Sequence, residues 1–233
     1  MTNLINYKVF ERPLTNLMPE LLPTIFPIGL ILEGRRCLVV GGGTMADQKV
    51  GGLRSAGAPV TVVAPRVCDR LRSRAADDAG IDLVERAYRT SDLDGTWLVV
   101  AATDISEIDG LVSAEAHERQ IFVNAVDDPP HCSAYLMAQV RRGPVVVSIS
   151  TSGASPAMAS YLRRRLDAEL ESSLGEVALL LSSVRQEIAA EGRTTEGLPW
   201  ASVIDDELIA DVTAGRHSLA ADRIRSTVIG SGR

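Results

Sequence analysis

Short apolar runs alternate with segments of helical spacing through the first part of the chain. The clearest runs are RCLVV (36–40), VTVVA (60–64) and WLVVAA (97–102), and such continuous runs are typical of strands covered on both faces. Residues 81–85 and 121–126 are further strand candidates, while 45–55 and 105–119 carry apolar residues at helical spacing. This order predicts β-α-β units in a doubly wound parallel sheet.

The pattern changes after residue 143. PVVVSIS (144–150) predicts one more strand, and a helix is expected from Pro156 to about residue 170. Beyond it, a second helical candidate covers 203–212, and apolar residues recur at helical spacing at Leu174, Val177, Leu181, Val184 and Ile188. Because no strand pattern remains in this part, we expect a small helical unit at the C-terminus.

These changes of pattern predict four segments. Residues 1–23 show no sustained period and are expected to form an N-terminal extension. Residues 24–143 are expected to form the α/β domain, 144–170 a connecting segment, and 171–233 the helical C-terminal domain.

Composition removes several classes of function. The 233 residues include 24 Lys and Arg against 30 Asp and Glu, and a net charge of −6 makes nucleic acid an unexpected partner. The apolar stretch 21–32 is too short to span a membrane and contains Pro23 and Pro27, and no signal-peptide pattern precedes it. Three cysteines and three histidines lie scattered, which predicts neither disulfides nor a metal site. We therefore expect a cytoplasmic protein.

A glycine-rich sequence follows the first predicted strand. Gly41, Gly43 and Ala46 satisfy the pattern G-x-G-x-x-A at the start of a predicted helix. Gly41 permits a tight turn, Gly43 leaves room for a pyrophosphate, and Ala46 allows the helix to pack closely on the strand. Backbone N–H groups at a helix start bind phosphates. The motif therefore predicts a dinucleotide-binding domain, with a glycine turn that binds nothing as the alternative.

The second predicted strand ends without the acidic residue that commonly binds the ribose hydroxyls. Instead, Pro65 and Arg66 follow Ala64. Arg66 is either a contact to a phosphate, to adenine or to a 2′-phosphate, or a solvated side chain, so spacing alone leaves NAD and NADP both open.

Two polar segments follow later strands. NAVDDPP (124–130) lies at the carboxyl end of a parallel strand, where open α/β sheets bind ligands, and Asp127 is there either a general acid or base or a capping residue. Ser150, Thr151 and Ser152 precede the helix that starts at Pro156. This hydroxyl-rich loop can donate hydrogen bonds to an anion, with Ser155 as a helix cap.

Four segments occur in the order and at the spacing of a known family: FPIGLILEGRRCLVVGGGTMADQK, WLVVAATD, IFVNAVDDP and ISTSGASPAMASYLRRRL. Through these segments, from about residue 26 to residue 170, the chain resembles the siroheme synthase N-terminal family, the precorrin-2 dehydrogenase and sirohydrochlorin ferrochelatase group.

The resemblance implies a Rossmann-type NAD-binding domain, a segment over 144–170 that joins two subunits into a homodimer, and a helical domain over a tetrapyrrole cleft. It implies oxidation of precorrin-2 to sirohydrochlorin with NAD, and many members also insert ferrous iron to give siroheme. Members of the family commonly lack the acidic residue that binds the ribose hydroxyls at the end of the second strand. Its absence here therefore agrees with the family, and NAD is the expected cofactor. Iron insertion by this chain stays open, because the family uses no evident His or Cys cage.

The resemblance also implies roles for individual residues. Asp127 falls on the catalytic aspartate of the family, which acts as acid or base. Nucleotide contacts are implied for Thr44, Met45, Pro65, Arg66 and Thr103. Contacts to the carboxylate-rich tetrapyrrole are expected from Asn124, Ser150, Thr151 and Ser152.

Two other classes of protein share parts of the pattern. A non-catalytic NAD-sensing regulatory module would have the glycine-rich turn, but such domains usually keep the acidic residue that this chain lacks at its second strand. A methyltransferase that uses S-adenosylmethionine fits the helix start and the VDDP sequence less well. Thermal shifts measured with NAD and with S-adenosylmethionine separate these classes.

Overall fold

The computed structural model describes residues 22–230. The chain forms two compact units that divide between Leu136 and Met137. Residues 1–21, which make up most of the expected N-terminal extension, lie outside the described part.

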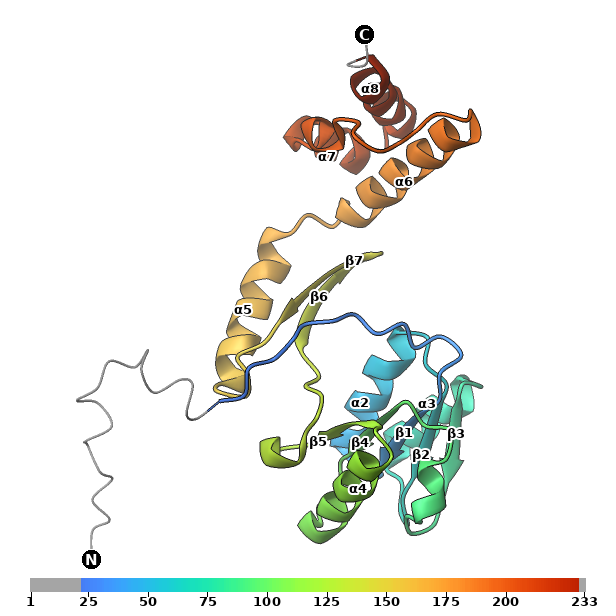
Figure 1. Ribbon diagram of the computed structural model, residues 1–233, viewed down its shortest axis with the longest axis vertical. Coiled ribbons are helices and arrows are strands. Elements are labelled where there is room, and N and C mark those ends of the chain that lie inside the picture. Colours follow the sequence, from blue (N-terminus) through green and yellow to red (C-terminus); the bar gives the residue numbers. More distant parts are fainter. Residues whose placement is uncertain (1–21, 231–233) are drawn as a thin grey trace, which may run out of the picture. The chain divides into compact units, whose positions relative to one another are not determined.

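The first unit is built on a five-stranded parallel sheet with the strand order β3-β2-β1-β4-β5 (Figure 1). Each strand is found at a position where the sequence predicts one: β1 (Cys37–Val40), β2 (Val60–Val63), β3 (Ile81–Val84), β4 (Leu98–Ala101) and β5 (Phe122–Ala125). All four residues of β1 and of β4 are buried, which is the reason that their sequences lack polar alternation. The doubly wound α/β fold is confirmed.

Alternate residues of the central strands pack on opposite faces of this sheet. Cys37 and Val39 belong to the core that the sheet forms with α2 (Thr44–Ser55) and α3 (Asp69–Asp77). Leu38 and Val40 belong to the core on the other face, against α4 (Ser106–Glu118). Helices therefore cover both faces, and the chain changes its direction of winding between β1 and β4. Ligands of open α/β sheets bind in the crevice at such a position.

The helix α3 was not predicted from the sequence. Its nine residues, DRLRSRAAD, contain five charged side chains, and Leu71 is its one buried residue. A helix that buries a single apolar residue leaves almost no periodic pattern to detect. Its position is fixed instead by ion pairs to neighbouring elements.

The second unit begins with an antiparallel pair of strands. β6 (Ala138–Arg142) pairs with β7 (Val145–Ile149) across a turn at Gly143, which has a φ of 55°. The strand expected over 144–150 is therefore present, but it belongs to this hairpin and not to the parallel sheet. The expected boundary at residue 143 falls on the turn of the hairpin, whereas the compact units divide after Leu136. α5 (Pro156–Glu169) follows, capped by Ser155, whose side chain accepts a hydrogen bond from the N–H of Met158.

Three helices complete the second unit: α6 (Leu174–Ala190), α7 (Asp206–Thr213) and α8 (His217–Gly230). They share one apolar core, to which Val184 and Ile188 of α6, Leu208 of α7 and Ile224 of α8 contribute fully buried side chains. The helical arrangement agrees with the sequence prediction for this part, although α8 was not predicted separately.

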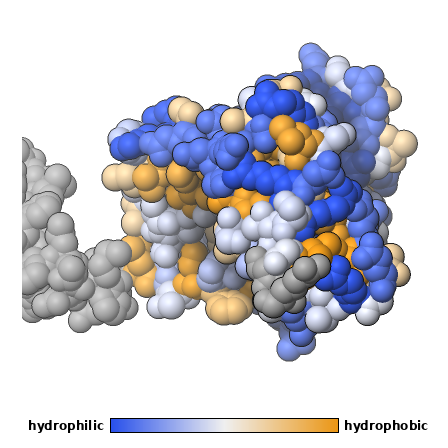
Figure 2. All heavy atoms as spheres, turned by 90° about the horizontal axis from the view of Figure 1, so that it is seen from above, coloured by the Kyte–Doolittle hydropathy of each residue, from blue (hydrophilic) through white to orange (hydrophobic). Residues whose placement is uncertain are grey.

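On the face drawn in Figure 2, hydrophilic and hydrophobic residues are interspersed. Between residues 22 and 230, no helix is long and apolar enough to span a membrane.

A buried carboxylate joins α2 to α3. Asp47 is fully buried, and its two oxygens lie 2.7 Å from Nε of Arg74 and 2.8 Å from Nε of Arg70. The hydrogen bond from Arg74 holds the pKa of Asp47 below its usual range, although burial opposes this shift. Asp47 stands one turn into α2, so its two ion pairs fix the helix that follows the glycine-rich turn.

We expect Asp47→Asn to lower the free energy of unfolding at pH 7 by about 1–3 kcal/mol, because both arginines then face a neutral amide. Since the pKa of Asp47 is lowered in the folded state, its carboxylate stabilises the fold above the unfolded-state pKa of about 3.9. This stabilisation is lost as the pH falls through the folded-state pKa, so the difference between the variant and the wild type shrinks toward pH 2. Urea unfolding across this pH range measures it.

Asp82→Asn is the matched control. Asp82 is exposed on β3, and its loss should change the free energy of unfolding by less than about 0.5 kcal/mol at any pH. Equal losses for the two variants at pH 7 would show that the Asp47 pairs do not hold the helices together.

Candidate functional site

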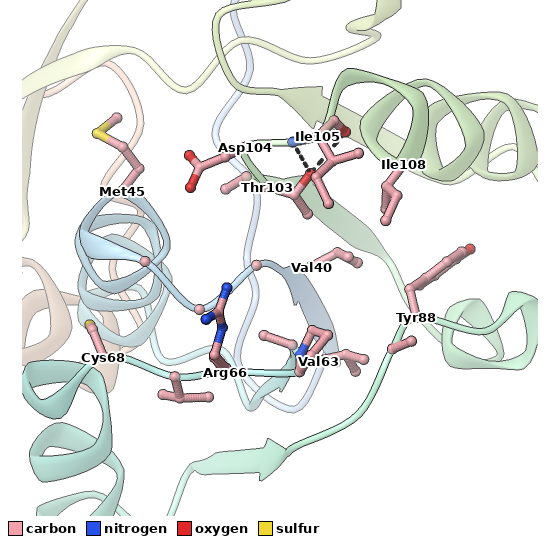
Figure 3. Close-up of a pocket in the computed structure, with 18 of the residues that line it drawn as sticks. Val40, Met45, Val63, Arg66, Cys68, Tyr88, Thr103, Asp104, Ile105 and Ile108 are labelled. Carbon is pink, nitrogen blue, oxygen red and sulfur yellow. Dashed lines mark hydrogen bonds between the residues drawn. The ribbon is translucent and has the colours of Figure 1, made fainter.

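A cavity of about 680 Å³ opens at the carboxyl ends of β1, β2 and β4, where the winding of the sheet reverses (Figure 3). Its walls come from the turn after β1 (41–45), the end of β2 and its following loop (63–68), the end of β4 (102–105), and Val40, Ala87, Tyr88 and Ile108. The cavity therefore lies at the position at which this type of sheet binds ligands.

Gly41 and Gly42 stand where the turn after β1 touches two other chain segments. A Cβ at Gly41 would overlap the carbonyl oxygen of Ala102 at the end of β4, and the φ of Gly41 is 129°. A Cβ at Gly42 would overlap the carbonyl oxygen of Arg66, and the Gly42 oxygen accepts a 2.8 Å hydrogen bond from the N–H of Cys68. Glycine is required at both positions because backbone fills the space that a side chain would occupy.

Gly43 has a different environment. A Cβ placed there would meet no atom within 4 Å, although the residue lines the cavity. Gly43 is the N-cap of α2, with extended backbone angles, and no side chain caps the helix there. The first N–H groups of α2, from Thr44 onward, therefore have no capping side chain and can bind an anion in the cavity.

The end of β2 supplies one cation to the cavity. Pro65 and Arg66 both line it, and Figure 3 shows the Arg66 side chain extending toward the glycine-rich turn. Ala64 is buried and stands where dinucleotide-binding domains commonly carry a carboxylate. The structure thus brings Arg66 together with Gly41, Gly43 and the α2 start.

Thr103 occupies the end of β4 on the opposite wall, and a buried carboxylate holds it. Its N–H and its Oγ1 donate to Oδ1 of Asp109 at 3.2 and 2.8 Å, and the N–H of Ile105 donates to its Oγ1 at 3.1 Å. Burial raises the pKa of Asp109, while the hydrogen bonds from Thr103 lower it, and nearby Asp128 and Asp104 raise it further. Asp109 is a residue that the sequence analysis missed.

An apolar wall completes the cavity, and the sequence analysis missed this part as well. Val40, Val63, Tyr88 and Ile108 line this part of the cavity, and Figure 3 labels all four. The hydroxyl of Tyr88 donates a 2.6 Å hydrogen bond to Glu115, and burial together with this carboxylate raises the pKa of Tyr88, so the hydroxyl stays protonated. The half-exposure of Ile105 at the start of α4, which indicates an apolar ligand surface, is known only from the structure.

The residues predicted after β5 lie at the same edge of the sheet but do not line this cavity. Asp127 is exposed, has a φ of 58°, and no described residue forms a hydrogen bond or an ion pair with its carboxylate. Asn124 is buried, and its Nδ2 donates to the carbonyl oxygen of Ala134 at 3.0 Å. The amide of Asn124 thus fixes the loop that carries Asp127.

Ser150, Thr151 and Ser152 belong to the second unit. Thr151 Oγ1 accepts from the N–H of Ser155 at 3.1 Å and donates to its carbonyl oxygen at 3.2 Å, and Ser150 Oγ accepts from the N–H of Ser152 at 3.0 Å. Ser152 has a φ of 53°. Two of the three hydroxyls therefore hold the loop in front of α5, a local role that sequence reasoning did not assign to them.

Curated relatives align with most of the chain. The siroheme synthase of Thioalkalivibrio sulfidiphilus is 35% identical over 205 residues, which are 87% of this chain and 42% of that protein. The siroheme synthase of Pseudomonas entomophila is 38% identical over 203 residues, which are 86% of this chain and 43% of that protein. The chain therefore spans less than half the length of these relatives.

Two family models match the chain, and the first match ends close to the boundary between the two compact units. A model of NAD(P)-binding domains matches residues 28–138, and a model described as sirohaem biosynthesis protein central matches residues 142–169. Both models and both relatives show that the chain is similar to a part of the siroheme synthases. A solved structure titled SirC, precorrin-2 dehydrogenase, has the same fold with a TM-score of 0.64 and 25% identity, over 87% of this chain and all of that one.

The cavity of this siroheme synthase relative fits the dinucleotide that the family model names. The uncapped start of α2 and the open space at Gly43 suit a pyrophosphate, and the wall around Ile108 suits an apolar ring. The residues that would hold the dinucleotide are Gly41, Gly43, Thr44, Met45, Pro65, Arg66 and Thr103, all of which line one cavity.

The two outer glycines of the turn give a sharp test of this fit. We expect Gly43→Ala to raise the Kd for NAD about tenfold with the unfolding temperature changed by no more than about 2 °C, because the new methyl group meets no protein atom but occupies the cavity. Gly41→Ala should instead lower the unfolding temperature, since its Cβ overlaps Ala102 and its φ is 129°. Calorimetric titration and thermal unfolding measure both effects.

Gly52→Ala serves as the control, because Gly52 lies inside α2 with open space around its Cβ and does not line the cavity. It should raise stability slightly and leave the affinity for NAD unchanged. Unchanged affinity in Gly43→Ala would refute a phosphate site at this turn.

Proposed function

We propose that this chain oxidises precorrin-2 to sirohydrochlorin and passes the hydride to NAD. The observation that carries this proposal is the glycine-lined cavity at the reversal point of the sheet, in a chain similar to a part of the siroheme synthases. The structural neighbour whose title names a precorrin-2 dehydrogenase supports it, because this chain covers that one completely.

The chain contributes binding and orientation to this reaction. NAD, when bound, supplies the acceptor for a hydride, and the N–H groups at the start of α2 bind its phosphates. Thr103 keeps a fixed position because Asp109 accepts hydrogen bonds from both its N–H and its hydroxyl. The apolar wall excludes water from one side of the cavity. Orientation of the two reactants is the largest contribution that such a site can make.

We assign to Asp127 the role of the base that accepts the proton. The oxidation removes two hydrogens from the tetrapyrrole, one as a hydride and one as a proton, so a base is needed beside the dinucleotide. The carboxylate of Asp127 has no partner among the described residues and follows β5, the strand next to β4. Its left-handed backbone, with a φ of 58°, is a conformation that aspartate tolerates better than most residues and that is frequent at functional positions.

The tetrapyrrole carries carboxylate side chains, for which the second unit offers donors. We assign Ser152, with the backbone of the loop around Ser150 and Thr151, to these carboxylates. Asn124 acts indirectly, because its amide holds the loop of Asp127 through Ala134.

We expect Asp127→Asn to lower the rate of precorrin-2 oxidation at least about a hundredfold, because the variant cannot accept a proton. Its Kd for NAD and its unfolding temperature should stay unchanged, since Asp127 neither lines the cavity nor bonds to described residues. Anaerobic turnover with precorrin-2 and NAD, followed through NADH and the tetrapyrrole spectrum, measures the rate. Asp82→Asn provides the matched loss of a remote carboxylate, and wild-type turnover in Asp127→Asn would remove Asp127 from the mechanism.

The same assay separates the proposal from its alternatives. NAD binding without NADH formation in the wild-type chain would favour the NAD-sensing module. Siroheme formed above the spontaneous rate after addition of ferrous iron would add iron insertion to the activity. Among the described residues no cluster of three His, Cys, Asp or Glu could hold a metal ion, and iron is a substrate in that reaction, which this assay tests directly.

A homodimer and a cytoplasmic setting belong to the same proposal. α5 buries none of its residues, and Met158, Tyr161 and Leu162 expose much of their apolar surface on it. An amphipathic helix with an exposed apolar face is typical of a subunit interface, and α5 lies within the residues matched by the central family model. All three cysteines are free, which agrees with a reducing compartment.

We expect Leu162→Asp to convert a dimer into monomers, because the charge would be buried against the second copy of α5. Sedimentation equilibrium measures the mass. Leu179→Asp, on a more exposed position of α6, is the control and should keep the wild-type mass. A wild-type chain that sediments as a monomer would remove the dimer from the proposal.

A further inference from the structure

The dinucleotide cavity contains one cation and one anion, and they stand on opposite walls. Among the residues that line it, Arg66 and Asp104 are the charged ones. In Figure 3, Arg66 comes from the segment after β2 and Asp104 from the segment after β4. Any anionic group of a ligand that contacts the β2 side of the cavity therefore meets the guanidinium of Arg66.

Arg66 differs from the arginines around it because no described residue neutralises it. Arg54 pairs with Asp78, Arg74 with Asp47, and Arg72 with Glu85. Arg66 is exposed and forms neither an ion pair nor a side-chain hydrogen bond with residues 22–230. Its charge is available to a ligand.

The backbone of Arg66 is held against the turn that binds the pyrophosphate. Its carbonyl oxygen fills the space in which a Cβ at Gly42 would lie, and the N–H of Cys68 donates to the Gly42 oxygen at 2.8 Å. Pro65 restricts the chain immediately before it. The backbone of Arg66 is therefore fixed beside the cavity, so that less conformational entropy is lost when the side chain binds a ligand.

The end of β2 carries no carboxylate that would repel a further phosphate. A carboxylate at this strand end commonly binds the 2′-hydroxyl of the adenosine ribose and repels a phosphate there, whereas an arginine nearby accommodates a 2′-phosphate. Here Ala64 is buried and uncharged, Pro65 follows it, and Arg66 is the first charged residue after the strand.

We propose that Arg66 binds the 2′-phosphate of a phosphorylated dinucleotide, so that this site accepts NADP as well as NAD. The pyrophosphate already has donors in the uncapped N–H groups at the start of α2, so the guanidinium is left for a further phosphate. The inference rests on the dinucleotide site of the proposed function and adds the choice of cofactor to it.

Binding measurements without tetrapyrrole test this assignment. The probes are NAD, NADP, adenosine 5′-monophosphate and adenosine 2′,5′-bisphosphate, each titrated calorimetrically into the full chain. We expect NADP to bind within about tenfold of NAD, and its Kd to rise more steeply with ionic strength, because it carries the additional phosphate. The bisphosphate should bind more tightly than the monophosphate for the same reason.

The variant Arg66→Gln identifies the group responsible. It should raise the Kd for NADP and for the bisphosphate at least about tenfold, and the Kd for NAD and the monophosphate less than about threefold. Arg66→Lys should recover part of the difference, because the charge is retained without the planar fork. Arg193→Gln, an exposed arginine of the helical unit outside the cavity, is the charge-matched control and should leave all four Kd values unchanged.

Three results would overturn the inference. The wild-type chain could bind NADP more than about a hundredfold more weakly than NAD. Arg66→Gln could weaken all four probes equally, which would place the guanidinium on the pyrophosphate or the adenine. It could also change none of them, which would make Arg66 a solvated side chain. Each of these results is independent of precorrin-2 oxidation, so a failure of the proposed activity remains distinguishable from a failure of this inference.

Discussion

The close approach of the glycine-rich turn to two other strand ends is the constraint on which the site depends. Gly41 leaves no space for a side chain beside Ala102, and Gly42 leaves none beside Arg66. Through these contacts the ends of β1, β2 and β4 come together around one cavity. Because backbone meets backbone at both places, a substitution cannot be absorbed by moving a flexible side chain, and the turn keeps the shape that exposes the start of α2.

Two buried carboxylates hold the segments on either side of the glycine-rich turn. The Asp47 pairs fix α2 against α3, and the hydrogen bonds of Asp109 fix Thr103 on the opposite wall. Both carboxylates are buried and engaged, so they hold the walls and leave the charges inside the cavity to Arg66 and Asp104. The separation of structural from ligand-facing charges is what allows the choice of dinucleotide to depend on a single guanidinium.

The cavity and Asp127, to which we assign the proposed proton transfer, occupy neighbouring positions of one sheet edge. The dinucleotide cavity lies around β1, whereas Asp127 follows β5, on the far side of β4 in the strand order. A dinucleotide has its adenosine and its reactive ring at opposite ends, and a base outside the phosphate-binding cavity is the arrangement that such a ligand needs. In the proposed dimer, the exposed apolar face of α5 would be covered by a second copy of the chain.

The sequence by itself determined the parallel sheet and the glycine-rich turn, because continuous apolar strands and a three-glycine turn leave local signals. It did not determine α3, which buries only Leu71, nor the partnership of Asp109 with Thr103. It also placed residues 144–150 as one more strand without showing that they pair with β6. Hairpin pairing, buried hydrogen bonds and the emptiness of the space at Gly43 are relations between distant segments, and only the tertiary structure decides them.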